Sequence, residues 1–114
     1  MSESVIDQAV FDGLKESVGA DYIPELVNAF LEDAPTLIAQ LRPALAAGDA
    51  EAFRRAAHSV KSNAATFGAT HLFELAKELE FMARENRLGE VGNRLEVLEE
   101  AFGRVAGALD KLRA

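Results

Sequence analysis

The sequence predicts an all-α protein, an antiparallel four-helix bundle with a short N-terminal helix that caps one end. Apolar residues recur at spacings of three and four, the period of amphipathic helices, along most of the chain. No segment shows the alternating pattern of a strand. The connections between the predicted helices are short, which favours antiparallel neighbours. The 114 residues suit one domain, so we expect a single domain over residues 1–114.

The first two helices are defined by their ends. We expect the first over residues 7–19, because Asp7 is a good N-cap residue and a glycine closes the segment. The second is expected over residues 21–48, with Pro24 in its first turn, where a missing N–H costs little. The apolar spacing keeps its phase across Pro35. This favours one long helix with a bend over the alternative of two separate helices.

Three further helices complete the predicted bundle. The third runs from an Asp49 cap to Phe67 and is closed by a glycine, and the fourth is expected over residues 69–87. The fifth carries apolar residues from Leu88 to Leu112, with spacings that alternate between three and four. Such a pattern is typical of the seam of a helix in a left-handed bundle.

The third helix carries the candidate functional residue, His58. On a helical wheel His58 falls about 140° from Phe53, on the side opposite the apolar face. The apolar face is expected to be buried and consists of Phe53, Ala56, Ala57, Val60, Ala64 and Phe67. The residues expected beside His58 on the outer face are Arg54, Lys61, Ser62 and Ala65.

This surrounding suits a histidine that carries a phosphoryl group. Exposed imidazoles are largely neutral near pH 7, and a neutral ring nitrogen is a nucleophile towards phosphorus. Lys61, and Arg54 if its side chain reaches, would offset the charge of a phosphohistidine. Small neighbours such as Ser62 and Ala65 leave room for a partner. The simpler interpretation is a solvated surface histidine, since a histidine with a cation three residues later is a weak pattern alone.

The segment 57–69 resembles the signature of the histidine-phosphotransfer (HPt) family. It reads Ala-His-Ser-Val-Lys-Ser-Asn-Ala-Ala-Thr-Phe-Gly-Ala. The family shows Ala-His-x-x-Lys-Gly, then small residues, then Gly-Ala. Similar matches occur at residues 30–35 and 47–49, and at Leu72 and Leu79-Glu80, so the resemblance covers nearly the whole chain. One departure is Ser62, where the family often has glycine, and it affects the detail of docking.

The resemblance implies a phosphorelay carrier rather than an enzyme. His58 would accept a phosphoryl group from an aspartate of a receiver domain and pass it to another, and Lys61 would stabilise it. Receiver domains of response regulators and a hybrid sensor kinase are the implied partners. The partner receiver would supply Mg²⁺, so we expect no cofactor on this chain. The alternative is a helical adaptor that has lost the chemistry, but such a protein should lack His58 or Lys61.

Composition and motifs argue against other classes. A net charge of −7 disfavours binding to nucleic acid or an anionic membrane, and the lack of cysteine excludes thiol chemistry. Glutamate does not precede either histidine by three residues, as a di-iron bundle would require, and no phosphate-binding glycine loop occurs. Met1–Ser4 does not resemble a signal peptide, so we expect a cytoplasmic protein. We also expect it to be a monomer.

Three residues of the fourth predicted helix lie off its apolar stripe. His71 has Glu74 rather than a cation three residues later, and we interpret it as a surface residue. Phe73 is expected to pack on a bundle interface wider than a simple stripe, with a docking patch or a dimer contact as the alternative. For Phe81 both interpretations stay open.

Overall fold

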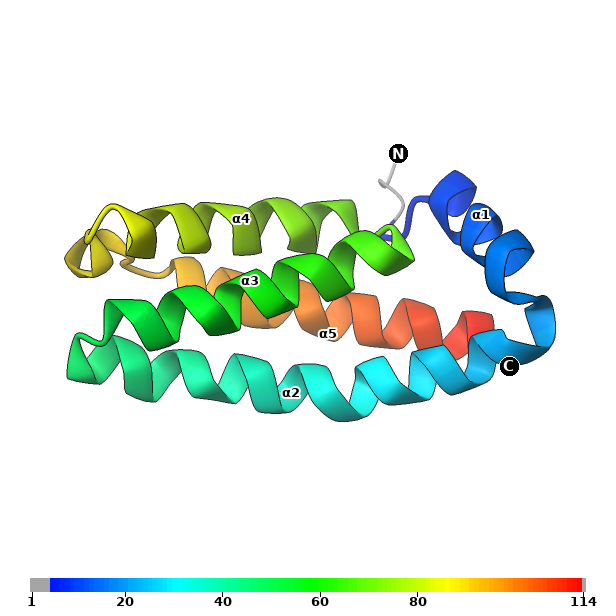
Figure 1. The fold of residues 1–114 in the computed structure, drawn as a ribbon, viewed down its shortest axis with the longest axis horizontal. Coiled ribbons are helices and arrows are strands. Elements are labelled where there is room, and N and C mark those ends of the chain that lie inside the picture. The colour runs from blue at the N-terminus through cyan, green and yellow to red at the C-terminus, as the bar shows by residue number, and fades with distance from the viewer. Residues whose placement is uncertain (1–4, 114) are drawn as a thin grey trace.

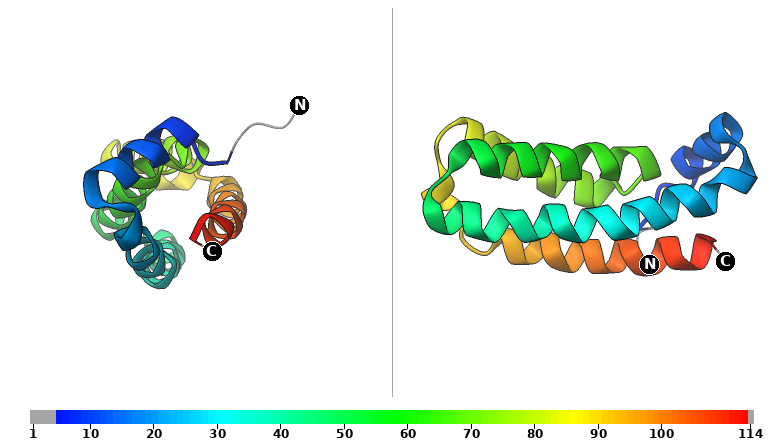
Figure 2. Two further views of the ribbon diagram at one scale, coloured as in Figure 1. Left: turned by 90° about the vertical axis from the view of Figure 1, so that its right-hand side faces the viewer. Right: turned by 60° about the horizontal axis from the view of Figure 1, so that its bottom comes forward.

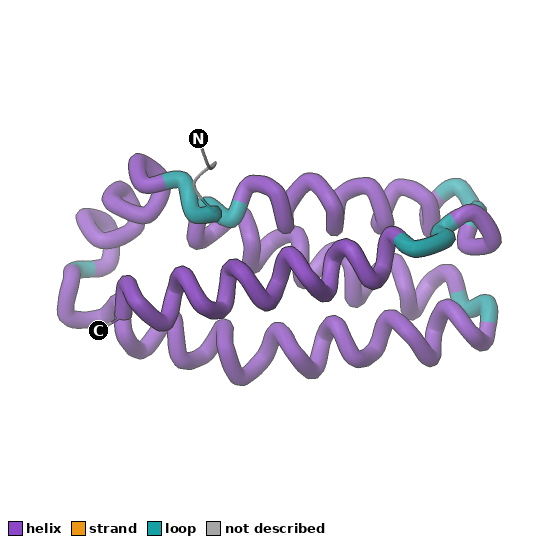
Figure 3. The backbone as a smooth tube through the Cα atoms, turned by 180° about the vertical axis from the view of Figure 1, so that it is seen from behind, coloured by secondary structure: helices purple, strands orange, loops and turns teal. Residues whose placement is uncertain are grey.

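The computed structural model describes residues 5–113, and within that range it contains helices and no strand (Figure 3). The expectation about Met1–Ser4 lies outside these residues. The elements in chain order are α1 (Gln8–Val18), the 3-10 turn η1 (Ala20–Tyr22), α2 (Ile23–Ala47), α3 (Ala50–Phe67), α4 (Thr70–Arg84), the 3-10 turn η2 (Leu88–Glu90) and α5 (Arg94–Arg113).

Helices α2 to α5 lie side by side as an antiparallel bundle, and α1 folds across one end (Figure 1). The view along the bundle shows the four long helices around a shared interior (Figure 2). Among them α3 contacts both α2 and α4, while α1 contacts α3. The predicted fold class is confirmed. No helix in the described range is both long and apolar enough to cross a membrane.

Aspartate side chains begin two of the helices, as the sequence predicted. The Asp7 carboxylate accepts hydrogen bonds from the backbone N–H groups of Ala9 and Val10, at 3.0 and 3.3 Å. The Asp49 carboxylate accepts one from Ala52 at 3.1 Å. These contacts satisfy N–H groups that a helix leaves without partners in its first turn.

Helix α2 is one continuous helix, so the alternative of two helices is wrong. It contains Pro35 and Pro43 in its interior. Each proline removes one backbone hydrogen bond and leaves a carbonyl without its helical partner. Both prolines lie on the exposed side of α2, where water can bind the carbonyl that each one frees.

The connection between α4 and α5 is longer than predicted. The helix expected over 88–112 begins only at Arg94, and α4 also ends short of its expected bound. Asn86 and Gly92 have φ angles of 60° and 56°, in the left-handed region that interrupts a right-handed helix. Val91 continues the apolar spacing and is 1% exposed, although it lies in this connection. The apolar spacing therefore predicted the burial of Val91 correctly, but it wrongly predicted that this segment is helical.

The expected face of α3 forms part of the core. All six predicted residues are buried, Val60 among them fully, and Leu98, within the apolar pattern of the fifth predicted helix, is fully buried as well. The interior also receives the apolar faces of the other long helices, including Phe30, Leu41, Leu72, Leu79 and Leu109. Because alanines make up half of the α3 face, this helix can approach its neighbours closely.

Gly68 joins α1 to the end of α3 and should not tolerate a side chain. Its φ is 74°, and a Cβ atom there would lie 2.9 Å from both the Asp7 carbonyl oxygen and the Val10 Cβ. The same segment is held by a 2.7 Å hydrogen bond from the Asp7 N–H to the Gly68 carbonyl. Gly48 also has a positive φ, 67°, but a Cβ atom there would meet no other part of the structure within 4 Å.

We therefore expect Gly68→Ala to destabilise the protein more than Gly48→Ala. In both variants alanine would have to adopt a left-handed backbone conformation, which costs about 1–2 kcal/mol. Gly68→Ala also overpacks the α1 contact, which raises its total cost to about 3 kcal/mol. Urea denaturation of the two variants measures the difference. Equal losses of unfolding free energy would show that the contact with α1 is not tight.

Candidate functional site

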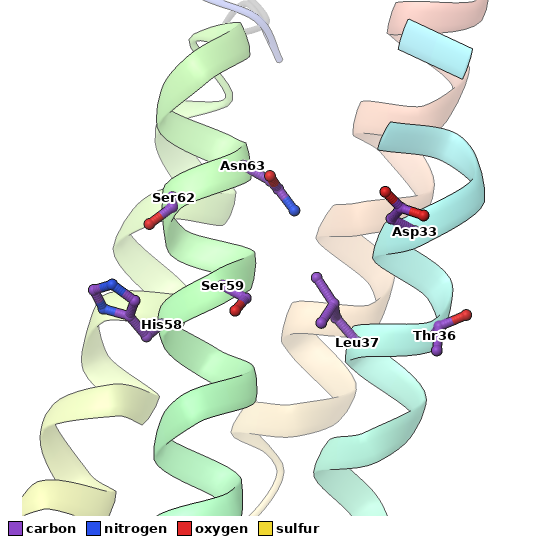
Figure 4. Close-up of a pocket in the computed structure, with 7 residues that line it drawn as sticks. All are labelled: Asp33, Thr36, Leu37, His58, Ser59, Ser62 and Asn63. Carbon is purple, nitrogen blue, oxygen red and sulfur yellow. The ribbon is translucent and has the colours of Figure 1, made fainter. Parts of the chain in front are cut away.

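His58 lies near the middle of α3, on the outer face of the bundle, as predicted. Its side chain is 54% exposed, whereas Ala57 and Val60 beside it in sequence are fully buried. The close-up shows the imidazole projecting from α3, with Ser62 one turn away (Figure 4). The helical period of α3 thus places its apolar residues on a buried face and His58 on the exposed face.

A buried carboxylate on α4 holds one nitrogen of the His58 ring. His58 Nδ1 lies 2.8 Å from Glu80 Oε2, and the Glu80 side chain is only 4% exposed. Within residues 5–113, His58 Nε2 has no protein hydrogen-bond partner. The ring is therefore fixed at one nitrogen while the other faces solvent.

Glu80 is bound by cations as well as by His58. Lys61 Nζ lies 2.7 Å from Oε1, and an Arg84 guanidinium nitrogen lies 3.2 Å from Oε2. Burial raises the pKa of the Glu80 carboxyl, but the hydrogen bonds from Lys61 and His58, together with the charge of Lys61, outweigh burial and lower the pKa below its ordinary value. An ionised Glu80 can only accept, so the His58 proton belongs on Nδ1 and the lone pair on Nε2.

The two cations predicted around His58 are both engaged by carboxylates. Lys61 shares the His58 side of α3, is 24% exposed, and is bound to Glu80. Arg54 forms two hydrogen bonds to Glu51, at 3.2 and 2.7 Å. Arg54 therefore pairs with Glu51, in the first turn of the same helix, instead of reaching towards His58.

An open depression of about 440 Å³ lies beside His58, between α2 and α3 (Figure 4). Its lining consists of Asp33, Thr36, Leu37, His58, Ser59, Ser62 and Asn63. Ser62, one of the predicted surrounding residues, therefore faces this depression. Ala65 is exposed on α3 but does not line it. The small serines leave space next to the ring, which a bulkier pair of residues would fill.

The other α4 residues considered from the sequence differ in their exposure. His71 is exposed, as predicted. Phe73 is partly buried and packs against the core, which confirms the wider-interface interpretation. Phe81 is 50% exposed and therefore does not belong to the core. Within the described range, no cluster of three or more potential metal ligands occurs.

Sequence reasoning missed the roles of Glu80 and Arg84. Glu80 falls about 80° from Leu72 on the wheel of α4, at the edge of the apolar stripe. A carboxylate at such an edge needs a partner when it is buried. Pairing α3 with α4 as antiparallel neighbours places Glu80 opposite His58, which is the signal that could have found it. Arg84 follows on the same face, four residues after Glu80.

Comparison with known proteins agrees with this geometry. The model of the family described as Hpt domain matches residues 25–114. The phosphorelay protein LuxU of Vibrio harveyi is 30% identical over 92 residues, which cover 81% of each chain. LuxU of Vibrio cholerae is 30% identical over 95 residues, covering 83% of this chain and 84% of that one.

A solved structure is similar over almost the full length. It is the crystal structure of histidine-containing phosphotransfer protein B (HptB) from Pseudomonas aeruginosa PAO1. The two share 34% sequence identity with a TM-score of 0.91, covering 98% of this chain and 96% of HptB. The family match, the LuxU relatives and HptB together place the chain in the class of histidine phosphotransfer proteins, which act in phosphorelays. The chain belongs to the Hpt domain family.

Proposed function

We propose that His58 carries the phosphoryl group, taking it from an aspartate of one receiver domain and passing it to an aspartate of another. The observation that carries this proposal is the exposed imidazole with Nδ1 fixed on the buried, ionised Glu80. This contact orients the ring and leaves the Nε2 lone pair available to a partner. We further propose that residues 1–114 work as one such domain, a cytoplasmic monomer.

The transfer step can be written with all atoms and charges accounted for. The Nε2 lone pair attacks the phosphorus of the aspartyl phosphate, and the Nε2–P bond forms as the P–O bond to the aspartate breaks. The aspartate leaves as a carboxylate with the electron pair of the broken bond. The Nδ1 proton stays in place, so the phosphorylated ring becomes cationic and faces the Glu80 carboxylate. Onward transfer reverses these steps.

The chain contributes position and charge, not a complete catalytic centre. A rigid helix presents Nε2 for in-line attack, and phosphoryl transfer depends chiefly on such positioning and on charge stabilisation. The Mg²⁺ that this chemistry requires would be held by the receiver domain. We infer that the protein alone neither makes nor hydrolyses a phosphoryl donor. The receiver would dock over His58, with the neighbouring depression leaving it space.

We propose that Lys61 stabilises the phosphoryl group through its charge while it stays on Glu80. Lys61→Ala should therefore slow transfer by about tenfold without preventing it, which corresponds to roughly 1.4 kcal/mol in the barrier. Solvent screening at this partly exposed site keeps the effect small. Single-turnover transfer from a phosphorylated receiver measures the rate. Complete loss of transfer in a folded Lys61→Ala protein would contradict a purely electrostatic role.

The decisive experiment is incubation of the wild-type protein with a phosphorylated receiver domain, followed by intact mass measurement. We expect the mass of one phosphoryl group, lost in acid and stable in base, as for phosphohistidine in this family. The rival function is an adaptor that keeps the bundle and binds receivers without chemistry. Binding of the receiver with no gain in mass would favour the adaptor and reject the phosphocarrier.

A further inference from the structure

The buried Glu80 carboxylate has more cationic partners than its charge requires. Lys61 lies 2.7 Å from Oε1 and is 24% exposed, so this close and partly buried pair alone offsets the single negative charge. Arg84 adds a second positive charge at 3.2 Å, from a side chain that is 58% exposed. With His58 neutral, the cluster of Glu80, Lys61 and Arg84 carries a net charge of +1. Arg84 is the cation in excess.

Arg84 also lies next to the His58 ring, where a positive charge could bind a phosphoryl group. Its guanidinium and the His58 Nδ1 bind the same oxygen, Oε2 of Glu80, so the two side chains are neighbours. Both are more than half exposed, so a group added to the ring would stand within reach of Arg84. A guanidinium offers a planar set of donors that matches two oxygens of a phosphoryl group, which a lysine does not.

We propose that Arg84 binds the phosphoryl group of phosphorylated His58, moving to it from Glu80, while Lys61 stays on Glu80. The proposal rests on His58 being the acceptor. Before transfer, Oε2 is shared by a neutral Nδ1–H and the Arg84 cation. After transfer the Nδ1–H belongs to a cationic ring, whose hydrogen bond to Oε2 is stronger. The ring thus replaces Arg84 as the cationic partner of Oε2, and a phosphoryl charge of about −1.5 to −2 attracts the released guanidinium.

The other cations near His58 are less suited to this exchange. Lys61 is more buried than Arg84 and is the partner of Oε1, which the ring does not contact. Releasing Lys61 would leave that buried oxygen without its cation. Arg54 makes two hydrogen bonds to Glu51, and both would be lost if it turned to the phosphoryl group. Arg84 gives up one contact of 3.2 Å.

The experiment compares Arg84→Gln and Arg84→Lys with the wild type, using Arg87→Gln as the matched control. Arg87 is also exposed and paired with a glutamate, Glu90 at 2.8 Å. Phosphoramidate serves as a small donor, which removes any contribution of receiver docking, and a phosphorylated receiver serves as the second donor. The ³¹P NMR signal of the phosphohistidine is followed against pH, and the rate of phosphorylation is measured with each donor.

For Arg84→Gln we expect phosphorylation about tenfold slower with both donors. The pKa of the phosphoryl group should rise by about one unit, since a nearby cation favours its doubly charged form. Arg84→Lys should restore part of the pKa change, and Arg87→Gln should resemble the wild type. An unchanged phosphoryl pKa in Arg84→Gln, or a rate loss seen only with the receiver, would overturn the proposal and leave His58 as the acceptor. Failure of the wild type to accept a phosphoryl group from either donor would reject both proposals.

Discussion

Replacement of His58 by glutamine is expected to abolish phosphoryl uptake from a phosphorylated receiver. Glutamine keeps a polar side chain of similar reach but has no nucleophilic ring nitrogen. The other imidazole in the chain, that of His71, lies on α4 and lines a different surface depression from the one beside His58. It should not replace His58. A time course of radiolabel transfer with the wild type and both histidine variants measures the effect.

His71→Gln is the matched control, and it should accept label at the wild-type rate. Because the His58 side chain is 54% exposed, His58→Gln should leave the melting temperature within a few degrees of the wild type. This separates loss of the acceptor from loss of the fold. Label that persists in the His58 variant, or vanishes in the His71 variant, would overturn the site.

Truncation of Leu98 to alanine is expected to lower the free energy of unfolding by about 2–5 kcal/mol. Leu98 is fully buried in α5, among the apolar residues of the bundle core. The loss combines the lost transfer free energy of the removed methyl groups with the cavity left behind. Small domains have a low free energy of unfolding, so a loss of this size would remove a large fraction of the total.

Leu112→Ala is the control on the same helix. Leu112 is 38% exposed, so its truncation should change the unfolding free energy by no more than about 0.5 kcal/mol. Chemical denaturation of both variants gives the comparison. Folded Leu98→Ala should still accept a phosphoryl group from a receiver, since Leu98 is buried in the core while His58 lies on the outer face of α3. Similar losses in the two leucine variants would contradict the packing of α5 described above.

The features that depend on one helix at a time were predictable from the sequence. The wheel of α3 separated six buried residues from an exposed His58, because burial on a helix follows its 3.6-residue period. The caps at Asp7 and Asp49 were equally local, since each depends on one side chain and the N–H groups that follow it.

The side-chain partners around His58 and the break before α5 were not predicted. Glu80 and His58 are 22 residues apart, and their contact depends on how α3 and α4 align. The cations beside His58 were identified by spacing, but spacing does not reveal which carboxylate each one binds. Arg54 pairs with Glu51 and Lys61 with Glu80. The break before α5 was missed because a buried turn and a helix can share the same apolar spacing.

With His58 as the proposed phosphoryl acceptor, the buried Glu80 carboxylate beside it also affects whether the phosphorylated or the unphosphorylated form of the protein is favoured at equilibrium. A phosphorylated ring that keeps its Nδ1 proton is cationic, so the Glu80 charge lowers the free energy of the loaded form relative to the empty form. Lys61 offsets part of this preference by sharing the same carboxylate. A carrier must hold the group tightly enough to accept it and loosely enough to release it. The ratio of loaded to empty protein, in equilibrium with one receiver, measures where this balance lies.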